Sequence, residues 1–319
     1  MSPAPSVAVV GHVEWVLFGR VRRLPSAGEV AHATGAFEEP AGGGAVAAVQ
    51  LARLAGTCRL FTVLGEDEPG RASRARLRDL GVEVLDEPAA KRTLEPVVER
   101  TGGAPDAPGA GQDRQGVVLT KGVATRRAVT VVDDAGERTI TTFGDRLDPA
   151  GDSGSAHWEE LRELDSAYFT AGDVPALRRA REAARVLVAS PRARHALGHG
   201  VALDALVLSA HDEIEVAAAE PVEGEAELVI HTEGARGGRW RRRSGEQGRY
   251  PAAPVPGPVI DAYGCGDSFA AGLTFGLGAG MPLESALHLA ARCGAVCLTG
   301  AGPYQRQLTA RELREQPVK

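Results

Sequence analysis

Lysine is almost absent from this chain of 319 residues, which contains only Lys91, Lys121 and Lys319. Neither internal lysine follows a glycine, so no Gly-x-x-x-x-Gly-Lys-Ser/Thr phosphate loop can be written, and this excludes the P-loop kinases. Any phosphate chemistry in this chain would therefore depend on backbone amides, arginines and a metal ion. A Gly-x-Gly-x-x-Gly segment after the first strand is also missing, which argues against a dinucleotide-binding dehydrogenase.

Cysteine and long apolar segments are scarce as well. The four cysteines, Cys58, Cys265, Cys293 and Cys297, form no Cys-x-x-Cys pair. No basic segment precedes the first apolar strand, and no apolar run reaches the ~18 residues that a membrane helix needs. We therefore expect reduced thiols, no signal peptide, no membrane partner and a cytoplasmic location.

The charge of the chain is moderately acidic, with a net charge of −6 and a pI near 5.8. Its one strong basic run, residues 239–243, is therefore expected to be a solvated loop or an edge strand, and we expect no nucleic-acid partner. Hydrophobic residues make up 43% of the chain, which allows a large core in one big or two unequal domains.

Short apolar segments alternate with helical segments along most of the chain. This order predicts an α/β fold with a mainly parallel sheet. The expected strands are Val7–Val10, Leu60–Leu64, Ala167–Thr170, Val186–Ala189, Leu206–Leu208 and Leu228–His231, and the expected helices include Gly70–Leu80, Ala176–Ala184 and Leu283–Leu298.

Two regions interrupt that pattern. Residues 12–39 and 128–142 alternate apolar and polar positions, the second around a turn at 134–136, as exposed strands do. Residues 101–116 are rich in Gly, Pro and Asp and are expected to form a surface loop. This loop is either an idle insertion or a segment that orders over a substrate.

Residues 261–267 read Asp-Ala-Tyr-Gly-Cys-Gly-Asp and carry most of the functional information. The two glycines permit a tight turn, and a helix is expected to begin near Asp267. Free N–H groups at a helix N-terminus favour an anion. A carboxylate in that position suits a base that deprotonates a hydroxyl while a phosphoryl group is transferred to it.

With this segment the chain resembles the ribokinase (PfkB) family, whose signature is Asp-Thr-x-Gly-Ala-Gly-Asp. The chain departs from the signature at Ala262 and Cys265. Further family elements occur in the family's order: Pro25 with Gly28-Glu29, Gly42-Gly43-Gly44, residues 65–70, residues 132–138 and Thr232-Glu233-Gly234-Ala235-Arg236-Gly237.

The resemblance implies a ribokinase-like three-layer fold with a mainly parallel central sheet and a small β-sheet lid. The core would comprise residues 1–11, 41–90 and 143–319, and the lid residues 12–40 and 91–142. It also implies an ATP-dependent carbohydrate kinase that uses Mg²⁺, with K⁺ as a further candidate cation.

The resemblance assigns roles to residues at each part of the site. Gly264, Cys265 and Gly266 would form the anion hole, with Asp267 as the catalytic base and Asp261 near a monovalent cation. Thr232, Gly234 and Gly237 would lie against the nucleotide phosphates, and Cys293, on the helix from 283 to 298, near the nucleotide.

The substrate side departs from the family. Gapless counting places Val16 at the usual sugar-binding Asp and Val46 at the Asn of Gly-Gly-x-x-x-Asn, after Gly42 and Gly43. Glu14 is the candidate replacement, because a carboxylate accepts from two hydroxyls; an exposed lid position is the alternative. The expected substrate therefore either carries an apolar or aromatic portion, as a nucleoside does, or is a modified sugar.

The family's metal-site motif Asn-x-x-Glu is also altered. Counting from Val207-Leu208 leaves Ala210 at the Asn position and Glu213 as the candidate acid, with Asp212 as the alternative if the register differs.

Three hypotheses remain open. The chain is a carbohydrate kinase, a nucleoside kinase with Trp15 or Phe37 lining the substrate, or a non-catalytic sensor of nucleotide or sugar. Its partner is expected to be a small molecule, and a homodimer through the lid is reasonable.

Overall fold

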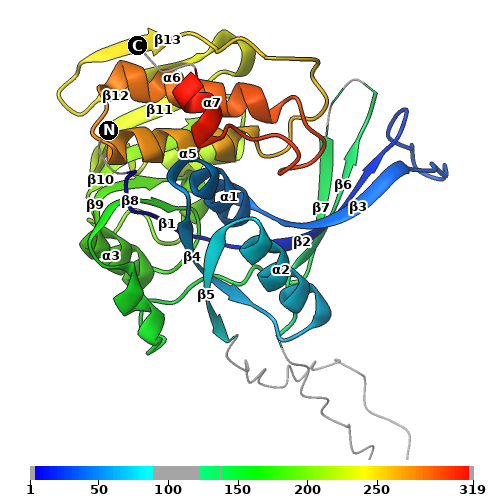
Figure 1. Cartoon of the computed structure of the whole chain (residues 1–319), viewed down its shortest axis with the longest axis horizontal. Coiled ribbons are helices and arrows are strands. Elements are labelled where there is room, and N and C mark those ends of the chain that lie inside the picture. Colours follow the sequence, from blue (N-terminus) through cyan, green and yellow to red (C-terminus); the bar gives the residue numbers. More distant parts are fainter. Residues whose placement is uncertain (1–3, 89–122, 135, 137, 316–319) are drawn as a thin grey trace, which may run out of the picture.

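The computed structural model describes residues 4–88, 123–134, 136 and 138–315 (Figure 1). The order of the central nine-stranded sheet is β13-β12-β11-β10-β9-β8-β1-β4-β5. Seven strands run parallel: β1 (Val7–Val10), β4 (Cys58–Leu64), β5 (Val82–Pro88), β8 (Leu164–Phe169), β9 (Ala184–Ala189), β10 (Leu203–Ser209) and β11 (Ala226–Thr232). The predicted mainly parallel α/β sheet is confirmed. Most of the observed strands extend one to three residues beyond the predicted apolar segments, at one or both ends.

Helices cover both faces of this sheet and make the three layers. Along β1, Val7 and Val9 join the core shared with α1 (Gly43–Ala55), α5 (Cys265–Gly278) and α6 (Leu283–Cys297). Ala8 and Val10 point to the opposite face, which α3 (Val174–Ala183) and α4 (Glu213–Ala219) cover. This alternation explains why β1 is apolar at every position, as strands buried on both faces are.

Two helices have the same kind of N-cap, an aspartate side chain. The Asp67 side chain accepts from Gly70 N at the start of α2 (Glu68–Asp79), and the Asp173 side chain accepts from Ala176 N at the start of α3. Each cap is followed by a proline in the first turn, where its missing N–H costs nothing. The last helix, α7 (Ala310–Glu315), contacts α1.

A second sheet of four strands projects from one side of the core (Figure 1). Its order is β3 (Thr34–Ala41), β2 (Glu14–Arg20), β6 (Arg127–Val132) and β7 (Arg138–Phe143). Both segments predicted as exposed strands are thus in one separate sheet, the lid of the sequence prediction. The predicted loop at 101–116 lies outside the described residues.

The basic run lies in β12 (Gly238–Arg242), an antiparallel strand that β13 (Gln247–Tyr250) pairs at the edge of the large sheet. Arg239 pairs with Glu233 at 2.7 Å, Arg241 with Glu223 at 2.5 Å and Arg242 with Glu246 at 3.1 Å. Local carboxylates therefore neutralise these three arginines. Across the residues described, no helix is long and apolar enough to cross a membrane.

Candidate active site

The signature turn ends in the left-handed conformation that glycine favours. Gly264, the N-cap of α5, has φ 79°, and a Cβ placed on it would lie 2.8 Å from Val46 Cγ1. Ser268 N makes the early intrahelical bond, to Gly264 O at 2.8 Å. The N–H groups of Gly266 and Asp267 precede that bond, and a Cβ on Gly266 would meet nothing within 4 Å. The backbone of the turn at Gly266 is therefore exposed, with room beside it.

Asp267 lies at the meeting point of three elements. A Cβ built on Gly43, at the start of α1, would be 3.0 Å from Asp267 Oδ1 and 3.0 Å from Thr170 Oγ1. Thr170 directly follows β8, and its buried hydroxyl has no hydrogen-bond partner. Glycine at position 43 thus lets a carboxylate and an unpaired hydroxyl both approach the start of α1 at the carboxyl end of the sheet, where α/β proteins bind ligands.

The environment of Asp267 favours its protonated form more than water does. Burial raises the pKa of the Asp267 carboxyl, Arg192 lowers it in opposition, and Glu215 raises it further, while Arg138 lowers it. A carboxylate whose pKa is raised toward the working pH is better matched to proton transfer than an ordinary one.

An arginine and a buried carboxylate face this aspartate from the next elements of the fold. Arg192 Nε donates to Glu215 Oε1 at 2.6 Å, and Ser209 N donates to Glu215 Oε2 at 2.8 Å. Glu215 is only 8% exposed. The Asp267 carboxylate is thus repelled by Glu215, in the first turn of α4, and attracted by Arg192.

The structure distinguishes between the two registers of the metal-site motif. Glu213, the predicted acid, is exposed, whereas Glu215 is buried and electrostatically coupled to Asp267. Asp212 and Glu215 have the Asn-x-x-Glu spacing two residues beyond the counted register, and Asp212 accepts from Ile214 N and Glu215 N as the cap of α4. The sequence analysis did not name Glu215, for which the Asp-x-x-Glu spacing was the available signal; Glu213 stays the residue predicted from the counted register.

The candidate substrate residue Glu14 is buried rather than exposed, at 7%. Its carboxylate lies 3.1 Å from Arg126 Nη1 and 3.7 Å from His12 Nε2. Burial raises the pKa of Glu14, and Asp267 also raises it, whereas Arg126 and two other arginines lower it. The effect of Asp267 links this cluster to the base electrostatically.

His12 completes the cluster as a neutral imidazole. Burial, reinforced by Arg146, Arg192 and Arg126, lowers the pKa of His12 to about 3. A Cβ on Gly42 would lie 3.1 Å from the His12 ring, so the ring packs directly against the glycine that precedes α1. His12 Nδ1 and Arg126 Nε are buried without a hydrogen-bond partner. Buried polar atoms are rarely left unpaired, and such atoms at a candidate site call for a ligand or water.

The two valines at the altered family positions do not join this polar cluster. Val16 and Val46 are both fully buried in the main core, and Val46 packs on the backbone of Gly264. The carbonyl of Val46 accepts from Gln307 Nε2 at 3.2 Å. Val46 thus supports the turn that carries Asp267.

Lid residues contact the signature segment directly. Arg138 of β7 donates to Ala262 O at 3.0 Å, and Arg20 of β2 donates to Ile260 O at 3.1 Å. Phe18 packs edge-on against Tyr263, with ring centroids 4.9 Å apart, and stacks on Phe37 at the same distance. The lid is therefore in contact with the segment that precedes the anion turn.

Asp261 is buried and holds two loops together. Its Oδ1 accepts from Tyr263 N at 2.8 Å and its Oδ2 from Gly302 N at 2.9 Å. A carboxylate has about four acceptor positions, so two remain after these bonds. Within the described residues no group of three or more His, Cys, Asp or Glu side chains is arranged to hold a metal ion.

The predicted phosphate loop follows β11. Thr232 Oγ1 donates to Leu208 O at 3.4 Å. Gly237 has φ 79°, and a Cβ there would lie 2.1 Å from Tyr250 O, so only glycine fits this position. Gly234 begins the short 3₁₀ turn between them. Ala210 N donates to Thr232 O at 2.9 Å, so this loop adjoins the end of β10 and the segment leading to Glu215.

The structure does not bring Cys293 to a nucleotide-accessible surface. Cys293 is fully buried, and its Sγ would lie 2.7 Å from a Cβ on Gly272 of α5. The side chain fills the contact between α5 and α6, because the face of α6 that contains it packs inward.

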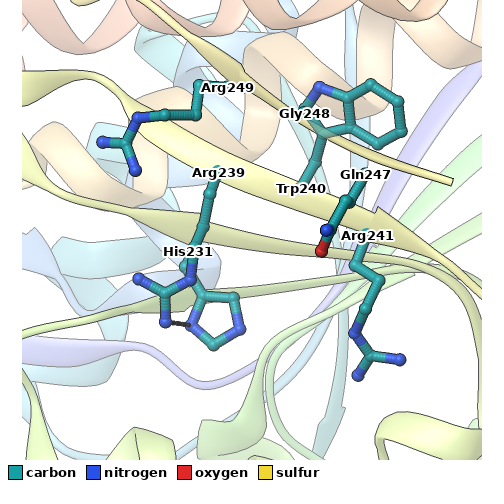
Figure 2. Close-up of a pocket in the computed structure, with 7 residues that line it drawn as sticks. All are labelled: His231, Arg239, Trp240, Arg241, Gln247, Gly248 and Arg249. Carbon is teal, nitrogen blue, oxygen red and sulfur yellow. Dashed lines mark hydrogen bonds between the residues drawn. The ribbon is translucent and has the colours of Figure 1, made fainter. Parts of the chain in front are cut away.

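A pocket of about 360 Å³ lies on the edge strands β11 to β13 and includes none of the signature residues. Figure 2 shows Trp240 and Arg239 on opposite sides of β12, with His231 beside Arg239. Arg239 and Arg249 already pair with Glu233, and Arg241 with Glu223. The pocket's charges are thus satisfied internally, and we place the candidate active site at Asp267 instead.

Comparison with known proteins identifies the family of the chain. Residues 113–310, more than half of the chain, match the pfkB family carbohydrate kinase family. A stretch of 77 residues is 44% identical to acarbose 7(IV)-phosphotransferase from Actinoplanes sp., which is 24% of this chain and 26% of that relative's length.

Two solved structures match across nearly the whole chain. A microbiome-derived acarbose kinase has a TM-score of 0.70 at 21% identity and covers 98% of this chain and 99% of its own. Arabidopsis thaliana ribokinase, solved with ribose and ATP, has a TM-score of 0.69 at 17% identity and covers 98% of both chains. The fold is ribokinase-like, and the chain belongs to the pfkB family of carbohydrate kinases.

Proposed function

We propose that this kinase transfers the γ-phosphate of ATP to a hydroxyl of a carbohydrate, with Asp267 as the base. The observation that carries the proposal is the position of Asp267: its carboxylate lies close to Gly43, in the first turn of α5 and next to the exposed backbone of Gly266. A hydroxyl bound there would have its proton within reach of a carboxylate and its oxygen facing an anion-binding turn.

The chain's own residues account for the main steps. Asp267 accepts the proton of the acceptor hydroxyl as the oxygen attacks phosphorus. The N–H groups of Gly266 and Asp267 stabilise the charge that grows on the transferred group, and Gly264 fixes the turn that aims them. Cys265 contributes its backbone to this turn. The lid, held to Ala262 by Arg138, limits the access of water.

Two buried carboxylates, Glu215 and Asp261, are the residues that we propose for cation binding. Mg²⁺ would neutralise phosphate charge. Glu215, and not Glu213, is the acid that would hold it, through water, because both Glu215 oxygens already accept hydrogen bonds. Asp261, with two unused acceptor positions, would contribute to a K⁺ site. Thr232, Gly234 and Gly237 are proposed to border the ATP phosphates at the end of β11.

Three polar side chains are proposed to bind the molecule that accepts the phosphate. Glu14, Arg126 and the neutral His12 are proposed to bind acceptor hydroxyls in place of the family's missing Asp and Asn, beside Gly42 and Gly43. The free Nδ1 of His12 supports this role. A nucleoside acceptor is less favoured, because Phe37 stacks on Phe18 and packs against Gly302.

The matches to acarbose kinases favour a larger acceptor than a single pentose. We propose that the acceptor is an oligosaccharide or pseudo-oligosaccharide with a free hydroxymethyl or ring hydroxyl. Support comes from the 44% identity to acarbose 7(IV)-phosphotransferase over 77 residues, and from the loss of the polar side chains at 16 and 46.

A homodimer through the lid is also proposed. All six residues of β7 are exposed, and Ile140 and Phe143 expose 43% and 55% of their surface. An open edge strand with apolar residues favours pairing with another copy. Light scattering of the purified chain tests this directly, with a monomeric mass as the contrary result.

An ATP-consumption screen tests the proposed activity. The acceptors should include acarbose, maltose-type oligosaccharides, single sugars, sugar phosphates and nucleosides, each with and without K⁺. We expect turnover with a carbohydrate acceptor that depends on Mg²⁺. Confirmed ATP binding without turnover on any acceptor would instead favour the sensor hypothesis.

A further inference from the structure

The family element at residues 65–70, Gly-Glu-Asp-Glu-Pro-Gly, holds a segment that lies far from it in the sequence. Asp67 caps α2, but its carboxylate also accepts two bonds from Thr125. Its Oδ1 accepts from Thr125 Oγ1 at 2.7 Å and its Oδ2 from Thr125 N at 3.0 Å. Gly65 N in turn donates to Thr125 Oγ1 at 3.0 Å. Thr125 is only 3% exposed, so these bonds are shielded from water.

Both glycines of the element make room for that segment. A Cβ on Gly65 would lie 2.5 Å from Thr125 N and 2.6 Å from Val123 O. A Cβ on Gly70 would lie 2.8 Å from Thr125 Oγ1. Residues 123–126 belong to no helix or strand, so contacts such as these, rather than sheet pairing, fix the chain before β6.

The residue after Thr125 is Arg126, which belongs to the proposed acceptor site. Its carbonyl oxygen accepts from Trp15 N at 2.9 Å, and its Nη1 lies 3.1 Å from the Glu14 carboxylate. Its Nη2 donates to Thr142 Oγ1 at 2.7 Å. The side chain of Arg126 is therefore held by strands of the lid, while its position relative to the core is set through Thr125.

We propose that Asp67 is a positioning residue for carbohydrate binding: through Thr125 it places Arg126 in the acceptor site. This inference rests on the proposed function, in which Arg126 binds acceptor hydroxyls together with Glu14. A carboxylate makes stronger hydrogen bonds than a neutral group, so the bonds of Asp67 resist displacement of the segment. Without them the guanidinium is less well placed, and the carbohydrate binds less tightly.

Asp173 provides a matched control for Asp67, because each caps a helix with a proline in its first turn. Asp173 Oδ1 accepts both of its bonds, from Gly151 N at 2.9 Å and from Ala176 N at 2.8 Å. Asparagine retains one such oxygen, so Asp173→Asn should preserve both bonds. Asp67→Asn keeps the oxygen for the cap but replaces Oδ2, the acceptor of Thr125 N, by an NH₂ group.

Steady-state kinetics of the full chain tests the proposal, with maltotriose and with each other carbohydrate that is phosphorylated in the screen. Asp67→Asn should raise the KM for the carbohydrate roughly 5-fold and leave kcat and the KM for ATP within about 2-fold of the parent values. Thr125→Val, which lacks the hydroxyl, should have the same effect. Thr125→Ser, which retains it, should restore the parent KM, and Asp173→Asn should behave as the parent chain.

The route through Arg126 is tested by combining variants. Because Asp67 acts through Arg126, Asp67→Asn should raise the KM for the carbohydrate no further in a chain that already carries Arg126→Gln. A further rise as large as that in the parent chain would contradict the proposal. So would an unchanged KM in Asp67→Asn, or an equal rise in Asp173→Asn.

Amide hydrogen exchange separates this inference from the kinase function. Thr125 N–H is bonded to Asp67 and Trp15 N–H to Arg126 O, so both amides should exchange at least about 10-fold faster in Asp67→Asn than in Asp173→Asn. Equal exchange in the two variants would overturn the proposal whether or not the chain turns over. Faster exchange in Asp67→Asn, with no turnover of any carbohydrate by the parent chain, would support the placement of Arg126 and count against the proposed kinase function alone.

Discussion

Gly43 and Asp267 lie so close that a Cβ on Gly43 would be 3.0 Å from Asp267 Oδ1. The same Cβ would lie 3.0 Å from Thr170 Oγ1, so the absence of a side chain at position 43 leaves room beside the carboxylate that we propose as the base. The first turn of α1 and the first turn of α5, far apart in the chain, thus form one site. This contact makes the role of the glycine testable without changing a charged group.

Gly43→Ala is expected to lower kcat by roughly 10-fold or more, because the methyl group displaces the carboxylate or the acceptor. Steady-state kinetics with the acceptor from the screen would measure it. Gly224→Ala is the matched control, since a Cβ there meets nothing within 4 Å and the residue has no positive φ. Equal kcat values for the two variants would contradict the contact.

Acidic pH should reduce activity through Asp267. A base acts only when deprotonated, so kcat/KM falls as the pH drops through its pKa, and burial raises that pKa above the ordinary 3.8. The acid limb of the profile, where kcat/KM falls with falling pH, should therefore lie at higher pH than for an aspartate with an ordinary pKa. Because Arg192 lowers this pKa, Arg192→Gln should move the limb to still higher pH. A limb that stays in place in Arg192→Gln would argue against Asp267 as its source.

The proposed binding of acceptor hydroxyls by Glu14, Arg126 and His12 predicts an effect on the KM for the carbohydrate. Glu14→Gln should raise the KM for the carbohydrate by roughly 10-fold, because a hydrogen bond to a charged group is lost, while the KM for ATP stays the same. Glu38→Gln, the same change at an exposed position of the lid, serves as the control. The assignment of Glu14 fails if both variants keep the parent KM for the carbohydrate.

Two glutamates of α4 offer an internal comparison. Glu215→Gln should raise the Mg²⁺ concentration needed for half-maximal activity by about 10-fold or more, since residues that orient metal-bound water have effects of this size. Glu213→Gln should behave as the parent chain, because Glu213 is exposed. A larger effect from Glu213→Gln would restore the register counted from the sequence.

The parts of the molecule that the sequence predicts well are those set by local pattern. The strand at 7–10 is apolar at each position, and the turn at 261–267 carries its own glycines and carboxylates, so both can be predicted from neighbouring residues alone. The exposed strands of the lid follow from strict alternation in the same way.

What the sequence does not predict depends on contacts between distant segments. Glu213 and Glu215 both follow β10 closely, and only the packing of α4 against the sheet shows which one is buried. The contact of Cys293 with Gly272 depends on how α6 is rotated against α5. The pairing of Glu14 with Arg126 joins the first residue of β2 to the residue before β6, which lie more than a hundred positions apart in the sequence.

The most direct test of the account is the turnover of Asp267→Asn, which keeps the shape of the side chain and removes the base. We predict that kcat falls by about 10²–10⁴-fold while calorimetry shows ATP bound with an affinity close to that of the parent chain. A kcat within a few-fold of the parent value would contradict the assignment of Asp267 and the mechanism built on it.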